Sequence, residues 1–90
     1  MEGQTLEELW RVARALDLTG LKCPMPALLT AKALRQLQGS AVVAVSVTDP
    51  LAPLDLRHLC QKDGHTVLAE RKNENGVQLL IRSGPRGSVS

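Results

Sequence analysis

The sequence predicts an α+β fold: a two-layer α/β sandwich of order βαβαββ, with a four-strand mixed sheet, two helices on one face and an extra N-terminal helix. Two observations predict this class. Segments in which apolar residues recur at every second position, or in which valines cluster, alternate along the chain with segments of helical periodicity, as in βαβ units. An Asn-Gly dipeptide near the C-terminal end separates two further apolar runs, which indicates a hairpin. With 90 residues, the chain has material for a single core.

Residues 1–14 are expected to form an amphipathic helical extension. Thr5 and Glu8 have the spacing of a capping box at the start of a helix. One apolar stripe follows at helical spacing: Leu6, Leu9, Trp10 and Ala13. Such a helix covers either its own domain or a partner. A lone tryptophan at helical spacing is more often a packing anchor than a site, so we expect the helix to pack on its own domain.

The first strand and first helix are expected over residues 16–19 and from Pro24 to about Gln38. The strand alternates with period two and stops at Gly20, and Gly39 ends the helix. The apolar face of this helix is predicted to consist of Leu29, Ala33 and Leu37, with Leu34 at its border and Lys32 and Arg35 pointing away. A strand, a helix and a second strand in this order form a right-handed crossover with parallel strands.

The second strand is expected over residues 41–48, and its valines alternate in a way that predicts a central position in the sheet. Asp49-Pro50 then opens the second helix, with Asp49 as N-cap and Pro50 at the first helical position. Gly64 ends this helix, and its apolar stripe is Leu56, Leu59 and Cys60.

A hairpin of residues 66–72 and 77–82 completes the sheet, since Asn75-Gly76 supplies its turn. The expected domain is therefore residues 15–83, and residues 84–90, which hold Gly, Pro and Ser without periodicity, are expected to be a flexible tail. The face of the sheet opposite the two helices is left open unless the N-terminal helix or a partner covers it.

Composition excludes several function classes. The formal net charge of +2 is small and the basic residues are dispersed, while Trp10 is the only aromatic residue. Nucleic-acid modules usually need a basic patch or aromatic stacking platforms, so we expect no direct nucleic-acid role. Neither a signal-peptide pattern nor a stretch of roughly 20 apolar residues is present, so we expect a cytoplasmic protein without a membrane span.

The segment with the clearest chemistry is Lys22-Cys23-Pro24-Met25-Pro26, where the first strand hands over to the first helix. A residue before proline is extended, which predicts Cys23 as N-cap and Pro24 as the first helical residue. Because Pro26 has no N–H, Met25 would be the one first-turn donor facing the sulfur. The positive end of the helix and the adjacent Lys22 would then lower the pKa of Cys23, and the sulfur would be an exposed thiolate.

The other candidate residues have plainer interpretations. Cys60 is expected to be a buried, inert thiol, because it lies on an apolar helical stripe; a resolving thiol is the alternative. His58 and His65 are expected at the surface or at helix ends, and Asp17 on a solvated strand face. Scattered Cys and His residues do not match zinc-site spacing, so no metal site is expected.

Cys23-Pro24-Met25-Pro26 resembles the Cys-Pro-x-Pro motif of the TusA/SirA-like family of small sulfur-carrier proteins. The resemblance extends over about residues 15–83. It includes residues 16–21 before the motif, Thr48-Asp49-Pro50 at the second helix and the closing residues 81–84. Position 25 is Met, where the tRNA-thiolation member carries Glu, so that pathway is not carried over.

The resemblance implies a sulfurtransferase-type persulfide carrier that acts as a stoichiometric relay. Cys23 would accept a sulfane sulfur from a cysteine desulfurase or a rhodanese and pass it to the thiol of an acceptor protein, with no metal or organic cofactor. The sequence favours no particular pathway among tRNA thiolation, sulfur oxidation, molybdenum-cofactor supply and selenium, and it leaves the oligomeric state open. Two other functions are alternatives: a redox switch that joins Cys23 to Cys60, and an interaction module that uses Trp10 and the open sheet face.

Overall fold

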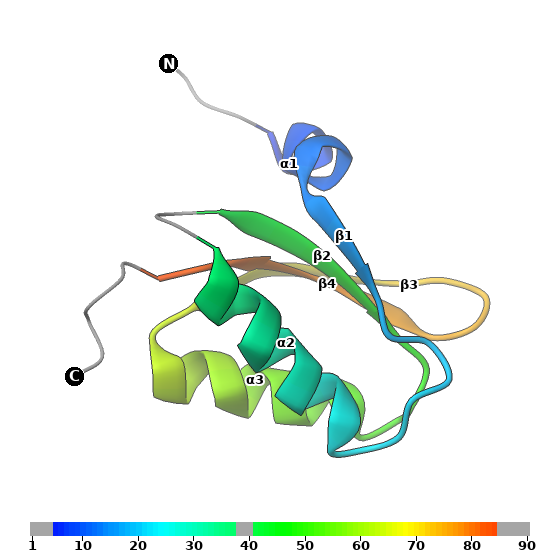
Figure 1. The fold of residues 1–90 in the computed structure, drawn as a ribbon. Coiled ribbons are helices and arrows are strands. Elements are labelled where there is room, and N and C mark those ends of the chain that lie inside the picture. The colour runs from blue at the N-terminus through cyan, green and yellow to red at the C-terminus, as the bar shows by residue number, and fades with distance from the viewer. Residues whose placement is uncertain (1–4, 38–40, 85–90) are drawn as a thin grey trace.

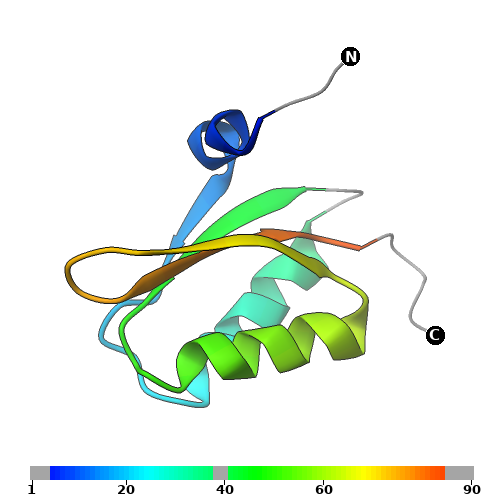
Figure 2. The ribbon, with the colours of Figure 1, turned by 180° about the vertical axis from the view of Figure 1, so that it is seen from behind.

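The computed structural model describes residues 5–37 and 41–84, and its elements follow the predicted order. The elements are α1 (Leu6–Val12), β1 (Arg14–Asp17), α2 (Met25–Gln36), β2 (Val42–Val47), α3 (Ala52–Asp63), β3 (Thr66–Lys72) and β4 (Val77–Arg82). Figure 1 shows α2 and α3 side by side on one face of the sheet and α1 on the other, and the view from behind in Figure 2 agrees. The predicted α+β class with a four-strand mixed sheet is confirmed.

The sheet has the strand order β1-β2-β4-β3. β1 runs parallel to β2, as expected for a strand–helix–strand crossover, and β4 is antiparallel to both β2 and β3. β2 therefore lies inside the sheet, which confirms the central position predicted from its valines. The hairpin has the predicted bounds, and the side-chain Oδ1 of Asn73 accepts from the backbone N–H groups of Asn75 and Gly76 in its turn.

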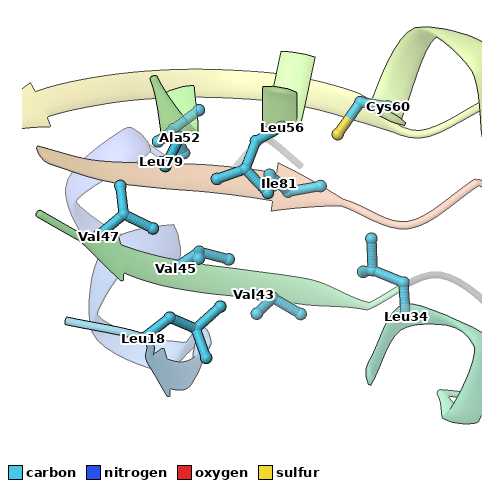
Figure 3. Close-up of a cluster of buried hydrophobic side chains, with 10 residues drawn as sticks. All are labelled: Leu18, Leu34, Val43, Val45, Val47, Ala52, Leu56, Cys60, Leu79 and Ile81. Atoms are coloured by element: carbon cyan, nitrogen blue, oxygen red, sulfur yellow. The ribbon is translucent and has the colours of Figure 1, made fainter. Parts of the chain in front are cut away.

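The main core lies between the sheet and the helix pair (Figure 3). Alternate residues of the two central strands point into it, and both helices contribute. Its buried members are Leu18, Leu34, Val43, Val45, Val47, Ala52, Leu56, Cys60, Leu79 and Ile81. The prediction that Cys60 is buried is thus confirmed. Within the described residues, no helix is long and apolar enough to span a membrane.

The buried face of α2 differs from the predicted one. Its buried residues are Pro26, Thr30 and Leu34, whereas Leu29 and Leu37 are only partly buried against the core. The predicted face was placed one position off because hydrophobicity alone identified it, and Thr30 is polar. The predicted end of this helix, at Gln38 and Gly39, lies outside the described residues.

A second, smaller core on the opposite sheet face explains α1. Leu9 packs there with Ala44 and Leu80, and Trp10 is partly buried beside them. Thr5 accepts a hydrogen bond from the N–H of Glu8 at 3.2 Å, as the capping box requires of the cap residue. The helix therefore packs on its own domain, as predicted, although Leu6 remains exposed.

Four predicted boundaries were wrong by two residues. The N-terminal helix ends at Val12 rather than at residue 14, because the chain is already extended at Ala13, and β1 begins at Arg14 rather than at Leu16. At the other two boundaries a carboxylate is the reason. β1 ends at Asp17 rather than at Thr19, because Asp17 Oδ1 accepts from the N–H and the hydroxyl of Thr19 and turns the chain. α3 begins at Ala52 rather than at Pro50, because the side chain of Asp49 accepts from the N–H of Leu51 in a turn that precedes the helix. Gly64 ends α3 in the left-handed conformation, with φ of 83°, as predicted.

Candidate functional site

The candidate site lies where two loops meet at one end of the sheet. Because β1 and β2 are parallel, the loop after β1 and the loop after β2 emerge at the same edge (Figure 1). The first loop carries Cys23 and leads into α2, while the second carries Asp49 and leads into α3. The starts of both helices are therefore brought together around Cys23.

Two hydrogen bonds attach the Cys23 loop to the second loop. The N–H of Gly20 donates to Thr48 Oγ1 at 2.9 Å, and the N–H of Cys23 donates to Asp49 Oδ2 at 2.5 Å. Gly20 has a φ of +85°, a conformation that glycine adopts without steric cost. These contacts join residues 28 and 26 positions apart in the chain, and they fix the backbone on which the sulfur is mounted.

The predicted helix cap is wrong in its details. The Cys23–Pro24 peptide bond is cis, and the N–H of Met25 donates to the carbonyl of Lys22 at 2.8 Å, which closes a turn with Pro24 at its third position. Pro24, not Cys23, occupies the N-cap position, and α2 begins at Met25. The N–H of Met25, which we expected to face the sulfur, is therefore already used within the turn. Pro26 is buried in the first turn of α2.

The thiol of Cys23 is exposed and free, and it donates a hydrogen bond to Asp55 Oδ2 in the first turn of α3. This hydrogen bond raises the pKa of Cys23, and desolvation and the negative charges of Asp55 and Asp49 raise it further. The predicted lowering of this pKa is thus wrong for the protein alone, because two carboxylates lie beside the sulfur. Lys22 acts instead on Asp49, whose pKa is lowered chiefly by the hydrogen bonds from Cys23 and Leu51.

Apolar side chains lie exposed at the same end of the molecule. Met25 and Leu28 belong to the first turn of α2, and Leu51 and Leu54 to the start of α3. These four side chains, which we call the apolar rim, are between 42% and 59% exposed. Large apolar side chains in contact with water at two adjoining helix starts are typical of a surface that binds other proteins.

The remaining candidates do not join this site. Cys60 is buried, and its burial, followed by the charge of Asp63, raises its pKa to about 11. It faces the main core on the part of α3 beyond Asp55, while Cys23 is exposed, and both thiols are free. His65 has a structural role, since its Nδ1 accepts from the N–H of Gly84 at 2.8 Å.

His58 and Asp17 are exposed, as expected. Asp17 has a lowered pKa because of its hydrogen bonds from Thr19, and it contributes nothing to the sulfur's surroundings. Across residues 5–37 and 41–84, no group of three or more His, Cys, Asp and Glu side chains is arranged to hold a metal ion.

Sequence reasoning missed Asp55 as a site residue and assigned Asp49 only a capping role. The available signal was topological. A carboxylate in the first turn of the helix after the second parallel strand lies at the same sheet edge as Cys23. The six-residue separation of Asp49 and Asp55 does not by itself show that both side chains reach the same cysteine.

Comparison with known proteins agrees with this architecture. The family model described as "Sulfurtransferase TusA" matches residues 14–83. Two Neisseria meningitidis proteins, "Putative sulfur carrier protein NMA0882" of serogroup A and "Putative sulfur carrier protein NMB0681" of serogroup B, are each 44% identical over 69 residues, which is 77% of this chain and 92% of theirs. The crystal structure of a SirA-like protein from Desulfitobacterium hafniense superposes with a TM-score of 0.69 and 28% identity, covering 78% of this chain and 96% of that one. With the family match over most of its length, the chain belongs to the sulfurtransferase TusA family.

Proposed function

We propose that this protein is a sulfur carrier in which Cys23 accepts a sulfane sulfur as a persulfide and relays it to the thiol of an acceptor protein. The observation that carries the proposal is the exposed, free thiol of Cys23 in the Cys-Pro-Met-Pro turn of a TusA-family chain. The names of the two Neisseria relatives support the same role. Cys60 is unsuited to it because it is buried in the core.

The relay is a pair of exchange reactions at sulfur. The Cys23 sulfur attacks the terminal sulfur of a donor persulfide, a new S–S bond forms, and the donor's S–S bond breaks with its inner sulfur leaving as a thiolate. The net reaction converts the Cys23 thiol and the donor persulfide into the Cys23 persulfide and the donor thiol. One S–S bond replaces another and the transferred sulfur keeps its oxidation state, so no external oxidant is consumed. The second exchange repeats this step with the acceptor thiol as the nucleophile.

The surroundings of Cys23 favour protein partners over a small substrate. The thiol stands at the surface, and the apolar rim offers Met25, Leu28, Leu51 and Leu54 to a docking face. Burial of such side chains is the main favourable contribution to most protein–protein association. We propose a cysteine desulfurase or a rhodanese as donor, and the reducing cytoplasm as the compartment in which the thiol stays available.

Mass spectrometry of the intact protein tests the proposal. The protein is incubated with a cysteine desulfurase and cysteine, or with a rhodanese and thiosulfate, and is then examined without reductant. We expect a gain of one sulfur atom that a later reductant removes, and peptide mapping should place it on Cys23. Cys60→Ala should still gain the sulfur and Cys23→Ala should not. No adduct with either donor, or an adduct that persists in Cys23→Ala, would refute the relay.

A further inference from the structure

We propose that Asp55, together with Asp49, holds the Cys23 sulfur as a neutral thiol in the free protein, and that a cationic group beside the partner's reactive sulfur releases it. This inference rests on the proposed relay for its biological meaning, but it concerns a property of the free protein. It assigns Asp55 a role in the site, and it specifies the charge that the partner presents. Asp55 and Asp49 are called the carboxylate pair below.

The carboxylate pair contacts two different atoms of the reactive residue. Asp55 Oδ2 accepts the hydrogen bond from the sulfur itself, whereas Asp49 Oδ2 accepts from the backbone N–H of Cys23. Asp55 comes from the first turn of α3 and Asp49 from the loop before it, so a single segment supplies both charges. Asp55 is thus the acceptor of the thiol proton, and this hydrogen bond orients the Cys23 side chain towards the start of α3.

The other charges near Cys23 do not offset this pair. The first turn of α2 consists of Met25, Pro26, Ala27 and Leu28, none of which is charged. Lys22 is the neighbouring cation in the chain, and its charge acts on Asp49. Lys22 does not cancel the effect of Asp55, because the pKa of Cys23 is raised in spite of its presence.

The chemical consequence concerns reactivity. A thiol attacks a persulfide or an alkylating agent only as the thiolate, so a neutral Cys23 is protected from stray electrophiles. A cationic side chain that pairs with the carboxylates would weaken both their repulsion of the thiolate and the hydrogen bond that retains the proton. The proton then leaves with the donor's departing thiolate, which becomes a thiol, and the exchange remains balanced. A partner with a lysine or arginine beside its reactive sulfur would therefore bind and activate Cys23 in one step.

The first experiment measures the alkylation of Cys23 by iodoacetamide as a function of pH, with the Cys23 peptide quantified by mass spectrometry. Asp55→Asn should lower the pH midpoint of the reaction and raise its rate at pH 7. Each tenfold gain in thiolate should give about a threefold gain in rate, because nucleophilicity falls as the thiol becomes more acidic. Asp55→Glu keeps the charge and should stay close to the unmodified protein. Asp63→Asn, on the same helix but acting on Cys60, is the matched control and should leave Cys23 unchanged.

The second experiment tests the charge of the partner with small disulfides. Cystamine is cationic, 2-hydroxyethyl disulfide is neutral and 3,3′-dithiodipropionate is anionic. Because the three leaving thiols differ in acidity, each rate of exchange with Cys23 is divided by the rate of the same disulfide with free 2-mercaptoethanol. The carboxylate pair should make these relative rates fall in the order given, and Asp55→Asn should reduce the ratio of the cationic to the anionic relative rate severalfold. High salt should reduce the same ratio, because exposed charges are screened.

Either of two results would overturn the proposal. An unchanged or higher pH midpoint in Asp55→Asn would show that the carboxylate does not retain the thiol proton. Equal relative rates for the three disulfides would contradict the cationic partner. Neither measurement involves sulfur loading, so a failure here is distinct from a failure of Cys23 to accept sulfur from a donor protein.

Discussion

The buried hydroxyl of Thr30 leads to a stability prediction. Thr30 lies in the middle of the buried face of α2 with 0% of its surface exposed, and its Oγ1 has no hydrogen-bond partner. An unsatisfied buried polar group costs about 1–3 kcal/mol, and Val has nearly the shape and helix propensity of Thr. Thr30→Val replaces the hydroxyl with a methyl group that benefits from burial. We therefore expect the free energy of unfolding to rise by about 1–2 kcal/mol.

Urea denaturation measures this gain as a higher midpoint with an unchanged m-value. In thermal melts, a domain of this size should gain about 4–8 °C in Tm for each kcal/mol. Thr66→Val is the matched control, because Thr66 is exposed, and it should change stability by no more than about 0.5 kcal/mol. An equal or lower stability of Thr30→Val would contradict the reasoning, since it would mean that the hydroxyl is satisfied within the folded protein.

Three further predictions concern Cys60, Gly76 and Trp10. Burial raises the pKa of Cys60 from 9.0 to about 11, so the protonated thiol stabilises the folded protein fully below pH 9, and this stabilisation is lost as the pH rises through 11. The loss, at most about 2.7 kcal/mol, should be absent from the pH–stability curve of Cys60→Ala. Gly76→Ala should lower stability by about 1–3 kcal/mol in urea melts, because its Cβ would lie 2.1 Å from the backbone oxygen of Val47, and an unchanged midpoint would refute the clash. Trp10→Ala should remove the contact in which the Arg71 guanidinium lies 3.9 Å from the indole centroid, and should lower the free energy of unfolding by about 1 kcal/mol or more. The pH profile of Cys23 alkylation should stay the same, and a changed profile would show that α1 affects the site.

The hairpin shows which parts of the fold are predictable from the sequence. Its strands have the predicted bounds because the determinants lie next to one another in the chain. Asn75-Gly76 favours the turn, and the side chain of Asn73 closes it with hydrogen bonds to residues two and three positions away. Gly64 is a similar case, since a glycine at the end of a helix needs only its own backbone freedom to stop it.

The end of β1 and the start of α3 were predicted less well, because polar side chains compete with the backbone for the same hydrogen bonds. Asp17 and Asp49 each accept an N–H group two residues further along the chain. Hydrophobic periodicity continues past such a turn, so the pattern alone does not reveal where the regular structure stops. Thr30 was missed on the buried face of α2 for a related reason, since the position is buried but its residue type is polar.

The largest error concerned the pKa of Cys23, which the sequence predicted to be lowered and which is raised in the structure. The motif contains a cation, a helix start and two prolines, and local reasoning from these features predicts a thiolate. The carboxylates that reverse the prediction are 26 and 32 residues away in the chain. They reach Cys23, Asp49 at its backbone N–H and Asp55 at its sulfur, because β1 and β2 are parallel and open their loops at one edge. A lone helix end would activate the thiol permanently, whereas two opposing carboxylates make its activation conditional on what approaches. For the relay proposed above, this arrangement gives Asp55 a chemical role beside Cys23, because it keeps the thiol protonated until a partner binds.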